Sequence, residues 1–383
     1  MISSPLTSMI SSIQITGYRG LDQLNMSDLG RVNLLVGTNN SGKTSVLEAI
    51  EILTSKGDPA RIWQITFRRG ERVTTLLPAI PGTPNDKAPR LHVEGDICHL
   101  FTGHEIHPGK RFSIAASNET PKRSVDLEII ELSPKERVEA MTLSASPDEL
   151  VSNLAITITG HPPPPSSRML LSRVGGISPE HIVFPRGGAS GSSDTQFITT
   201  ESISRDRLLS FWSKVALKPE EELVLQALRF LDKDIERIAP VAPSLPNVYA
   251  PSRGGFIIKR ASSEQPVPIG SMGDGMWRML AMSIAITLCK GGTLLVDEID
   301  TGLHYTVMSS MWKLIFNAAK QFDVQVFATT HSYDCIYSLA QLADESDAKN
   351  PITVQRLERG RSEAVPFSEQ ELVIAAEREI EVR

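Results

Sequence analysis

A glycine-rich segment near the N-terminus has the residue types and spacing needed to bind a nucleotide phosphate. Gly37, Gly42, Lys43 and Thr44 occupy every fixed position of the pattern G-x-x-x-x-G-K-[ST]. Glycines let successive backbone N–H groups face a phosphate, the lysine bridges the β- and γ-phosphates, and the threonine hydroxyl binds Mg²⁺. A chance match in a chain of this length has a frequency on the order of 1%. The predicted phosphate-binding residues are Gly37, Asn39, Asn40, Ser41, Gly42, Lys43, Thr44 and Ser45.

Two acidic residues follow a short apolar segment in the last third of the chain. The segment Thr293-Leu294-Leu295-Val296 has the pattern of a buried strand, and Asp297 and Glu298 come directly after it. An acid at the carboxyl end of a strand can hold Mg²⁺, and its neighbour can polarise an attacking water molecule. We therefore predict that Asp297 is a metal ligand and that Glu298 acts on water. The simpler alternative is an acid that only caps the next turn.

Two weaker segments accompany these motifs. His331 follows an apolar segment, in Phe327-Ala328-Thr329-Thr330-His331-Ser332, and could reach a γ-phosphate there. Ser271, Gly273 and Gly275 precede a predicted buried helix, whose N-terminus would form an anion site. A structural histidine and a plain helix cap explain the two segments equally well when each is taken alone. Their order along the chain favours a functional role for both.

The composition limits the class of protein. The chain has 383 residues, a formal net charge of −6 and 22% charged residues. This balance excludes a wholly cationic nucleic-acid-binding surface but not a local basic face. No apolar run approaches the roughly 20 residues that a bilayer requires, and the N-terminus lacks the features of a signal peptide. The three cysteines are widely spaced, which is typical of reduced thiols, so we expect a cytoplasmic protein with no membrane partner.

The elements expected around the motifs give an α/β fold. Short apolar runs predict core strands, and apolar residues at helical spacing predict the helices between them. A middle region of alternating residues predicts an antiparallel sheet, and residues 13–18 suggest a short edge strand. Residues 162–165 and 187–193 are predicted loops. The expected core strands are 31–36, 293–296, 324–328 and 352–357, the antiparallel strands 91–97, 112–116, 125–132 and 154–159, a further strand 256–259, and the helices 43–53, 219–239, 276–288 and 305–320, with another at the C-terminus.

The order of the four motifs points to a known class. G-T-N-N-S-G-K-T, S-M-G-D-G-M-W-R, L-L-V-D-E-I-D-T-G-L-H and T-T-H-S follow one another as in ABC-type ATPases. Within that class the chain resembles the SMC/RecF branch, in particular the ATPase module of the overcoming-lysogenisation-defect (OLD) family, from residue 13 to residue 383. The resemblance implies an ABC-ATPase head, a mixed sheet with a P-loop α/β core plus an antiparallel β subdomain and a helical insertion. The long separation of Lys43 from Asp297 fits such an insertion.

The resemblance also implies roles for the matching residues. Lys43 and Thr44 would bind the phosphates of ATP and Mg²⁺. Asp297 would be the Walker B acid, Glu298 the catalytic base and His331 the switch histidine. The signature differs from L-S-G-G-Q and the D-loop reads T-G-L-H, so the exact donor of the serine contact stays open. The resemblance implies a homodimer or higher homo-oligomer, in which the signature segment of one subunit completes the ATP site of the opposite subunit. This segment would comprise Ser271, Gly273 and Gly275, and residues 300–304 would be the D-loop.

Three lesser candidates remain. Gln64 is one option for the glutamine of the Q-loop. Four histidines within one segment could hold a metal ion, although their spacing has no recognised ligand pattern. Four arginines could contact DNA phosphates or simply form a solvated face. These sets are His92, His99, His104 and His107, and Arg61, Arg68, Arg69 and Arg72.

The predicted organisation has three units. Residues 1–140 form an N-terminal lobe with the phosphate loop, 141–245 a partly helical insertion for dimerisation or partner docking, and 246–383 a C-terminal lobe with the remaining motifs. The residues after His331 fit only a last strand and helix, so we expect no fused Toprim nuclease. The resulting hypothesis is an ATP-driven switch for a separate effector protein, such as a nuclease, in anti-phage defence. The alternative is a RecF-like ATP-dependent DNA-binding repair factor, and a transporter subunit fits the signature poorly.

Overall fold

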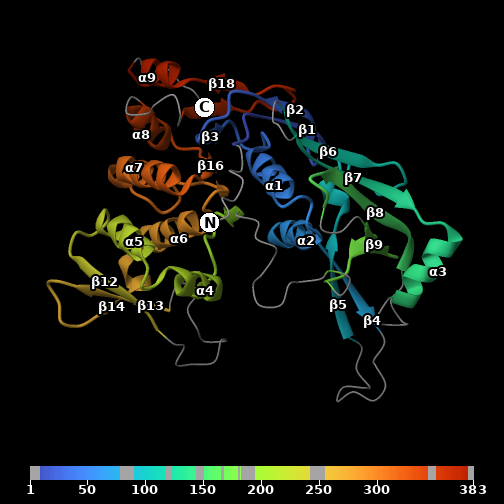
Figure 1. Ribbon diagram of the computed structural model, residues 1–383, viewed down its shortest axis with the longest axis horizontal. Helices are drawn as coiled ribbons and strands as arrows, with labels where there is room; N and C mark the ends of the chain where they lie inside the picture. The colour runs from blue at the N-terminus through green and yellow to red at the C-terminus, as the bar shows by residue number, and fades with distance from the viewer. Residues whose placement is uncertain are drawn as a thin grey trace, which may run out of the picture.

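The protein is built around a six-stranded sheet with a layer of structure on each face (Figure 1). The structure, a computed structural model, describes residues 9–77, 90–117, 122–143, 151–164, 168–179, 182, 195–241, 255–343 and 351–377. The first five strands of this core sheet run parallel, and the last is antiparallel to its neighbour. In spatial order they are β11 (Thr195–Ile198), β15 (Thr293–Val296), β16 (Gln325–Thr329), β3 (Val32–Val36), β17 (Ile352–Arg356) and β18 (Val365–Phe367).

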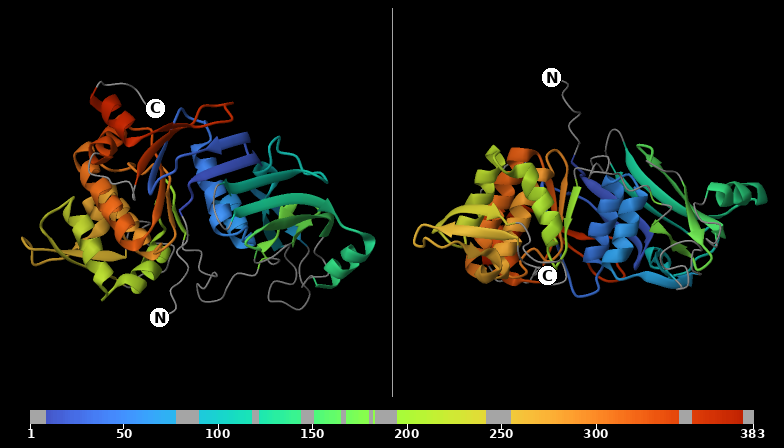
Figure 2. Two further views of the ribbon diagram at one scale, coloured as in Figure 1. Left: turned by 45° about the horizontal axis from the view of Figure 1, so that its top comes forward. Right: turned by 90° about the horizontal axis from the view of Figure 1, so that it is seen from below.

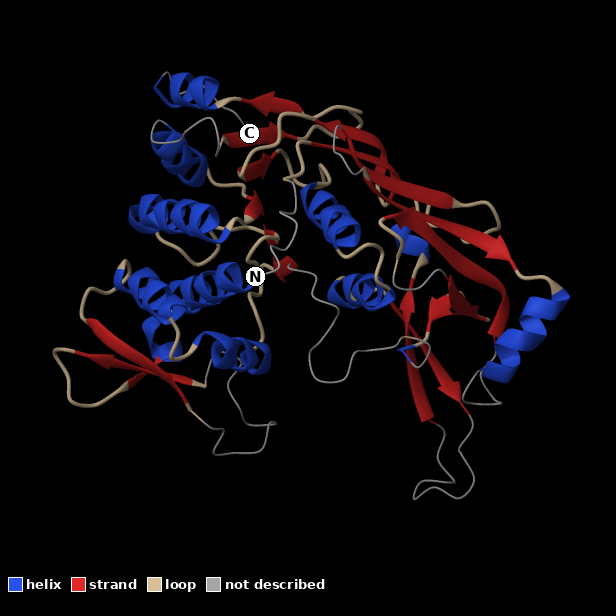
Figure 3. Cartoon of the chain, viewed as in Figure 1, coloured by secondary structure: helices blue, strands red, loops and turns tan. Residues whose placement is uncertain are grey.

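Alternate residues of the core strands face opposite layers, as the pleat of a strand requires. In β15, Leu294 and Val296 join one apolar cluster, while Leu295 joins the other. A column of helices covers the face to which Leu294 and Val296 point (Figure 3). Because both faces of the sheet are covered, the sequences of these strands are continuously apolar. These helices are α6 (Asp274–Leu288), α7 (Tyr305–Phe322), α8 (Tyr333–Ala343) and α9 (Glu369–Glu377).

Helix α1 (Lys43–Thr54) covers the second face and is itself enclosed by a second sheet (Figure 2). That sheet is antiparallel, as predicted, and α1 contacts both it and the core sheet. The strand expected at 13–18 is present as β1 (Ser12–Tyr18), but it is not an edge strand, because it pairs with a neighbour on each side. The strands in order are β2 (Leu21–Met26), β1 (Ser12–Tyr18), β6 (Arg111–Ser117), β7 (Arg123–Glu131), β8 (Val151–His161) and β9 (Arg168–Ser172).

The strand expected at 91–97 belongs to a different, smaller sheet. It is β5 (Arg90–Asp96), which pairs with β4 (Arg72–Leu77) and β10 (Gly176–Ile177). Helix α2 (Pro59–Arg68) packs against β5, and α3 (Pro134–Leu143) packs against β8. Periodicity identified the strand but could not say which neighbours it would take.

The helix predicted over 219–239 is wrong beyond Arg229. Helix α5 (Pro219–Arg229) ends there, and β12 (Ile235–Pro240) follows. Ile235 and Ile238 are both buried, and a register shift in the pairing of β12 lies between Ile235 and Arg237. The irregularity places two inward side chains three positions apart, which imitates helical spacing. Strand β12 pairs with β13 (Phe256–Arg260), which pairs in turn with β14 (Val267–Pro268). Helix α4 (Arg205–Val215) precedes α5.

The predicted insertion at 141–245 contributes to several layers. Strands β8 and β9 extend the antiparallel sheet, β11 pairs with β15 in the core sheet, and α4 and α5 pack on α6. Pro165 and the loop predicted at 187–193 lie outside the described residues. Within the described part of the chain, no helix is long and apolar enough to span a bilayer.

Three of the four arginines considered for DNA contact form ion pairs with two buried glutamates. Glu48 and Glu51 on α1 are only 2% and 1% exposed. Arg69 contacts Glu48 at 2.8 Å, while Arg68 and Arg61 both approach Glu51. All three arginines therefore neutralise buried carboxylates, Arg61 from a buried position, Arg68 from a partly exposed one and Arg69 from an exposed one. Arg72 differs, because its guanidinium lies over the ring of Phe67 at the surface.

This pairing predicts a large effect on stability. We expect Glu51→Ala to lower the free energy of unfolding by about 3 kcal/mol, because it leaves the buried Arg61 and the half-buried Arg68 without their carboxylate. Urea denaturation of the variant and of Glu128→Ala, which removes an exposed carboxylate from β7, provides the comparison. Equal free energies of unfolding for the two variants would contradict the proposed contribution of Glu51 to stability.

Candidate functional site

The glycine-rich loop joins β3 to α1 at the carboxyl edge of the core sheet. Gly42 caps α1 with a φ of 97°, and Gly37 has a φ of 141°. A Cβ atom on Gly37 would lie 2.3 Å from the carbonyl oxygen of Leu357. Both positions therefore require glycine, and the loop can close tightly before the first turn of the helix.

Lys43 is the cation of this loop. It is 6% exposed, and its Nζ donates to the carbonyl oxygens of Gly37 at 2.8 Å and Thr38 at 2.9 Å. Burial lowers the pKa of Lys43, while the nearby carboxylates of Asp297 and Glu298 act in the opposite direction. The amine thus lies at the loop, opposite the acids that end β15.

Two oxygen-bearing side chains meet where β15 ends. The Oγ1 of Thr44 donates to the carboxylate of Asp297, at 3.2 Å from Oδ1 and 3.1 Å from Oδ2. A carboxylate and a hydroxyl are hard oxygen ligands of the kind that Mg²⁺ prefers. The pair therefore fits Mg²⁺, which would be held by Thr44 and Asp297 and would neutralise phosphate charge when bound.

Glu298 has an unusual backbone conformation for a residue other than glycine. Its φ is +47°, in the left-handed region. Its backbone N–H donates to the hydroxyl of Thr329 at 2.7 Å, and its Oε2 accepts from Thr301 at 3.2 Å. Strained backbone of this kind is held by surrounding contacts and is common at active sites.

His331 lies two residues beyond Thr329, the last residue of β16. It lies next to Thr330, whose hydroxyl donates to Asp300 at 2.5 Å. The backbone N–H of Ile299 also donates to the carbonyl of Thr329, at 2.9 Å. The segment that carries the predicted switch histidine is thus bonded to the loop that follows β15.

The signature segment lies against the predicted D-loop of the same chain. A Cβ atom on Gly275 would lie 2.8 Å from the carbonyl oxygen of Gly302. Ser271 and Gly273 are exposed at the start of α6. Among the hydrogen bonds of the described residues, none joins Ser271 or Gly275 to the phosphate loop. The structure therefore brings Lys43, Thr44 and Asp297 together, while the described signature residues form no hydrogen bond with this group.

Arg278 links α6 to the acidic loop, a role that sequence analysis missed. It is 2% exposed, and its guanidinium donates to the carbonyls of Asp297 at 2.6 Å, Glu298 at 2.9 Å and Thr199. Burial lowers the pKa of Arg278 to about 10, although three carboxylates nearby oppose the shift. Its sequence signal, an arginine one turn after the signature, is visible, but its partners become apparent only in the fold.

We expect Arg278→Lys to reduce kcat about 10-fold while the KM for ATP changes little. Lysine keeps the charge but cannot span three carbonyl oxygens, so the loop of Asp297 and Glu298 loses its support. Steady-state hydrolysis measures this effect, with the exposed Arg237→Lys on β12 as the matched control. A kcat equal to that of the control would contradict the role.

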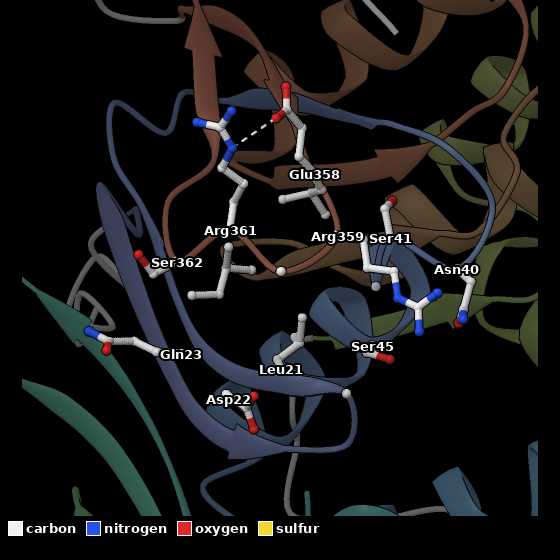
Figure 4. Close-up of a pocket in the computed structure, with 15 residues that line it drawn as sticks. Leu21, Asp22, Gln23, Asn40, Ser41, Ser45, Glu358, Arg359, Arg361 and Ser362 are labelled. Atoms are coloured by element: carbon white, nitrogen blue, oxygen red, sulfur yellow. Dashed lines mark ion pairs between the residues drawn. The ribbon is translucent and has the colours of Figure 1, made fainter.

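A pocket of about 290 Å³ lies beside the phosphate loop. The β1–β2 turn, the start of α1 and the β17–β18 turn form its walls (Figure 4). Arg359 lines it near the loop residues Asn40 and Ser41, while Arg361 pairs with Glu358 at 3.1 Å. No motif marks these residues, and the β17–β18 turn lies far from the loop in sequence.

The lesser sequence candidates separate in space. His92 contacts Glu94 at 3.1 Å, and His107 contacts Glu105 at 3.8 Å. His99 and His104 face each other, with their Nδ1 atoms 3.2 Å apart. The four histidines therefore do not form one ligand set.

Gln64 lies on α2, where its Oε1 is 3.5 Å from Arg61 Nη1. This contact belongs to the helix itself. No hydrogen bond of the described residues joins Gln64 to the phosphate loop.

Comparisons with known proteins agree with this geometry. Residues 9–157 match the family model "AAA ATPase domain", and residues 193–334 match "AAA domain, putative AbiEii toxin, Type IV TA system". An "ATP/GTP phosphatase" of Helicobacter pylori is 21% identical over 88% of this chain and 90% of its own length. The DNA replication and repair protein RecF of Pseudomonas syringae pv. tomato is 50% identical over 44 residues, 12% of each chain.

Among solved structures, an SMC head bound to the C-terminal winged-helix domain of ScpA aligns with a TM-score of 0.47. The alignment has 14% sequence identity and covers 95% of this chain and 99% of the SMC head chain. The two matched families cover the phosphate loop and the acidic strand end, which the fold brings within hydrogen-bonding distance. The chain is therefore an ATPase with an α/β P-loop fold, and two separate regions of it each match an AAA-type family model.

Proposed function

We propose that this ATPase is an OLD-like ABC switch, in which two chains close head to head on ATP and reopen on hydrolysis. The observation that carries the proposal is the division of the site. The phosphate loop and acids are joined within one chain, at 3.1 Å between Thr44 and Asp297, while Ser271 and Gly273 are exposed elsewhere. A second copy would supply its signature segment to complete the site.

The roles follow the geometry of the side chains. Lys43 would bind the β- and γ-phosphates, and the loop N–H groups with Ser45 would bind the remaining phosphate oxygens. Glu298 would accept a proton from the attacking water, and His331 would contact the γ-phosphate. The pocket beside the loop would take the nucleoside, since it is the space adjacent to Asn40 and Ser45.

We further propose that the switch acts on a separate effector protein, such as a nuclease, in anti-phage defence. Support comes from the resemblance to the OLD family and from the match of residues 193–334 to a domain described for a toxin of a toxin–antitoxin system. Purification of the tagged chain from its native host tests this part. A stoichiometric partner that is released on ATP hydrolysis would support it, and its absence in every nucleotide state would contradict it.

A second candidate is a RecF-like DNA-binding repair factor, favoured by the local identity to RecF. The ion pairs of Arg61, Arg68 and Arg69 with buried glutamates neutralise much of the basic run that would have supported DNA contact. ATP hydrolysis with and without linear duplex DNA separates the candidates. Several-fold stimulation that falls steeply with salt would favour the repair factor.

A further inference from the structure

We infer that Thr329, the last residue of β16, is a positioning residue that fixes both acids of the site through its one hydroxyl group. The inference rests on the proposed roles of Asp297 and Glu298. Thr329 is the first residue of the T-T-H-S segment, in which only His331 has been given a role. The neighbouring Thr330 acts in the same way on the loop that follows.

The hydroxyl of Thr329 has two partners. It donates to Asp297 Oδ1 at 2.7 Å and accepts from the backbone N–H of Glu298 at 2.7 Å. The side chain is 1% exposed, so water cannot readily replace either bond. Since a hydroxyl both donates and accepts, one group satisfies two opposite requirements that a methyl group could not meet.

The sheet puts Thr329 at this position. Strands β15 and β16 are parallel, and Val296 stands opposite Ala328. The next residues along the chain, Asp297 and Thr329, are therefore also adjacent. The main chain adds a third bond, from Ile299 N–H to the Thr329 carbonyl at 2.9 Å. Thr329 thus contacts three consecutive residues of the acidic loop.

These bonds explain how Glu298 keeps its left-handed backbone. The left-handed conformation is unfavourable for a residue with a side chain, so neighbouring contacts must hold it. The Thr329 hydroxyl holds the Glu298 N–H, and Arg278 holds its carbonyl at 2.9 Å. Fixing both ends of the residue directs its side chain and stops the loop from relaxing.

The same hydroxyl orients the carboxylate of Asp297. Oδ1 receives the 2.7 Å bond from Thr329, whereas Thr44 lies more than 3 Å from both oxygens. The shorter bond therefore restrains the rotation of the carboxylate, which stays within reach of Thr44 through both oxygens. Partners of this kind change metal affinity or activity about 10- to 100-fold when they are removed.

Thr330 extends the arrangement to the predicted D-loop. Its hydroxyl donates to Asp300 at 2.5 Å and accepts from the N–H of Ser332 at 2.9 Å. The side chain is fully buried. Two adjacent threonines, directly before His331, therefore fix the acid pair and the loop that would face a second copy.

The test compares Thr329→Val, which keeps the shape but removes the hydroxyl, with Thr329→Ser, which keeps the hydroxyl. We expect valine to lower kcat about 10- to 100-fold and to raise the Mg²⁺ concentration needed for half-maximal rate, while the KM for ATP changes less. Serine should recover most of the wild-type rate. The matched control is Thr353→Val on β17, which removes a buried hydroxyl that donates to Asn33 at 3.0 Å.

A merely structural role would give a different pattern. Equal kcat for Thr329→Val and Thr353→Val, or equal losses for the serine and valine variants, would overturn the inference. If the valine variant fails to fold, Thr329→Ala and Thr329→Ser provide the same comparison. If the wild type hydrolyses ATP and Glu298→Gln does not, yet Thr329→Val is unaffected, the inference fails while the proposed roles of the acids stand.

Discussion

The Glu298→Gln variant is expected to hydrolyse ATP at least about 100-fold more slowly than the wild type, while it binds ATP equally well. An amide has the size of the carboxylate but cannot accept a proton from water. The left-handed backbone at this position is held by Thr329 and Arg278, whose bonds involve only main-chain atoms of Glu298, so the substitution leaves them intact. The loss should therefore appear in kcat alone.

Phosphate release measures turnover, and a fluorescent ATP analogue measures binding. The matched control is Glu264→Gln, which changes an exposed glutamate between β13 and β14. Undiminished hydrolysis by Glu298→Gln would assign the base to another residue. A loss of ATP binding equal to the loss of rate would instead place Glu298 in substrate binding.

Replacing Lys43 by alanine should weaken ATP binding about 10- to 100-fold. A hydrogen bond to a charged group contributes roughly 1.5–3 kcal/mol, and every 1.4 kcal/mol corresponds to a factor of about 10 in Kd. Lys43 is the cation at the phosphate loop, and its amine lies between the loop carbonyls and the acids. Hydrolysis should fall with binding, unlike the selective loss expected for Glu298→Gln.

Equilibrium binding of the ATP analogue to Lys43→Ala checks this result. Lys135→Ala is the control, because it removes an exposed lysine on α3, which lies on the opposite side of the antiparallel sheet from the core (Figure 1). Thermal unfolding should be recorded as well, since Lys43 also donates to the carbonyl oxygens of Gly37 and Thr38. Binding as tight as that of the control would contradict the assignment of the phosphate loop.

The nucleotide motifs were predictable from the sequence because each combines a local pattern with a strand end. The apolar runs of β3, β15 and β16 mark strands buried on both faces, and the polar residues that follow must meet at one sheet edge. The fold class followed from the same runs. What the patterns could not supply was the order of the strands.

Thr329 and Arg278 show why part of the site was missed. Each acts through partners that sequence separates and the fold brings together, as β16 lies beside β15 and α6 packs against the same loop. The β17–β18 turn is a similar case, since it reaches the phosphate loop from near the other end of the chain. Thr329 and Arg278 lie in segments recognised as motifs, but a motif's spacing does not identify partners from other parts of the chain.

The errors have equally specific causes. Helical spacing in β12 arises from an irregular pairing, which no single-segment pattern reveals. The arginines of α2 resemble a basic surface until Glu48 and Glu51 are placed on the facing helix. Helix α1 is enclosed by two sheets, so even its glutamates are buried and require partners.

The central claim is that ATP closes two copies of this chain into one complex. Sedimentation velocity of the Glu298→Gln variant tests it directly, in the absence of nucleotide, with Mg²⁺-ADP and with Mg²⁺-ATP. We predict a doubling of mass with ATP alone, which is abolished when Gly273→Arg blocks the exposed signature segment. A mass that is unchanged by bound ATP would contradict the account.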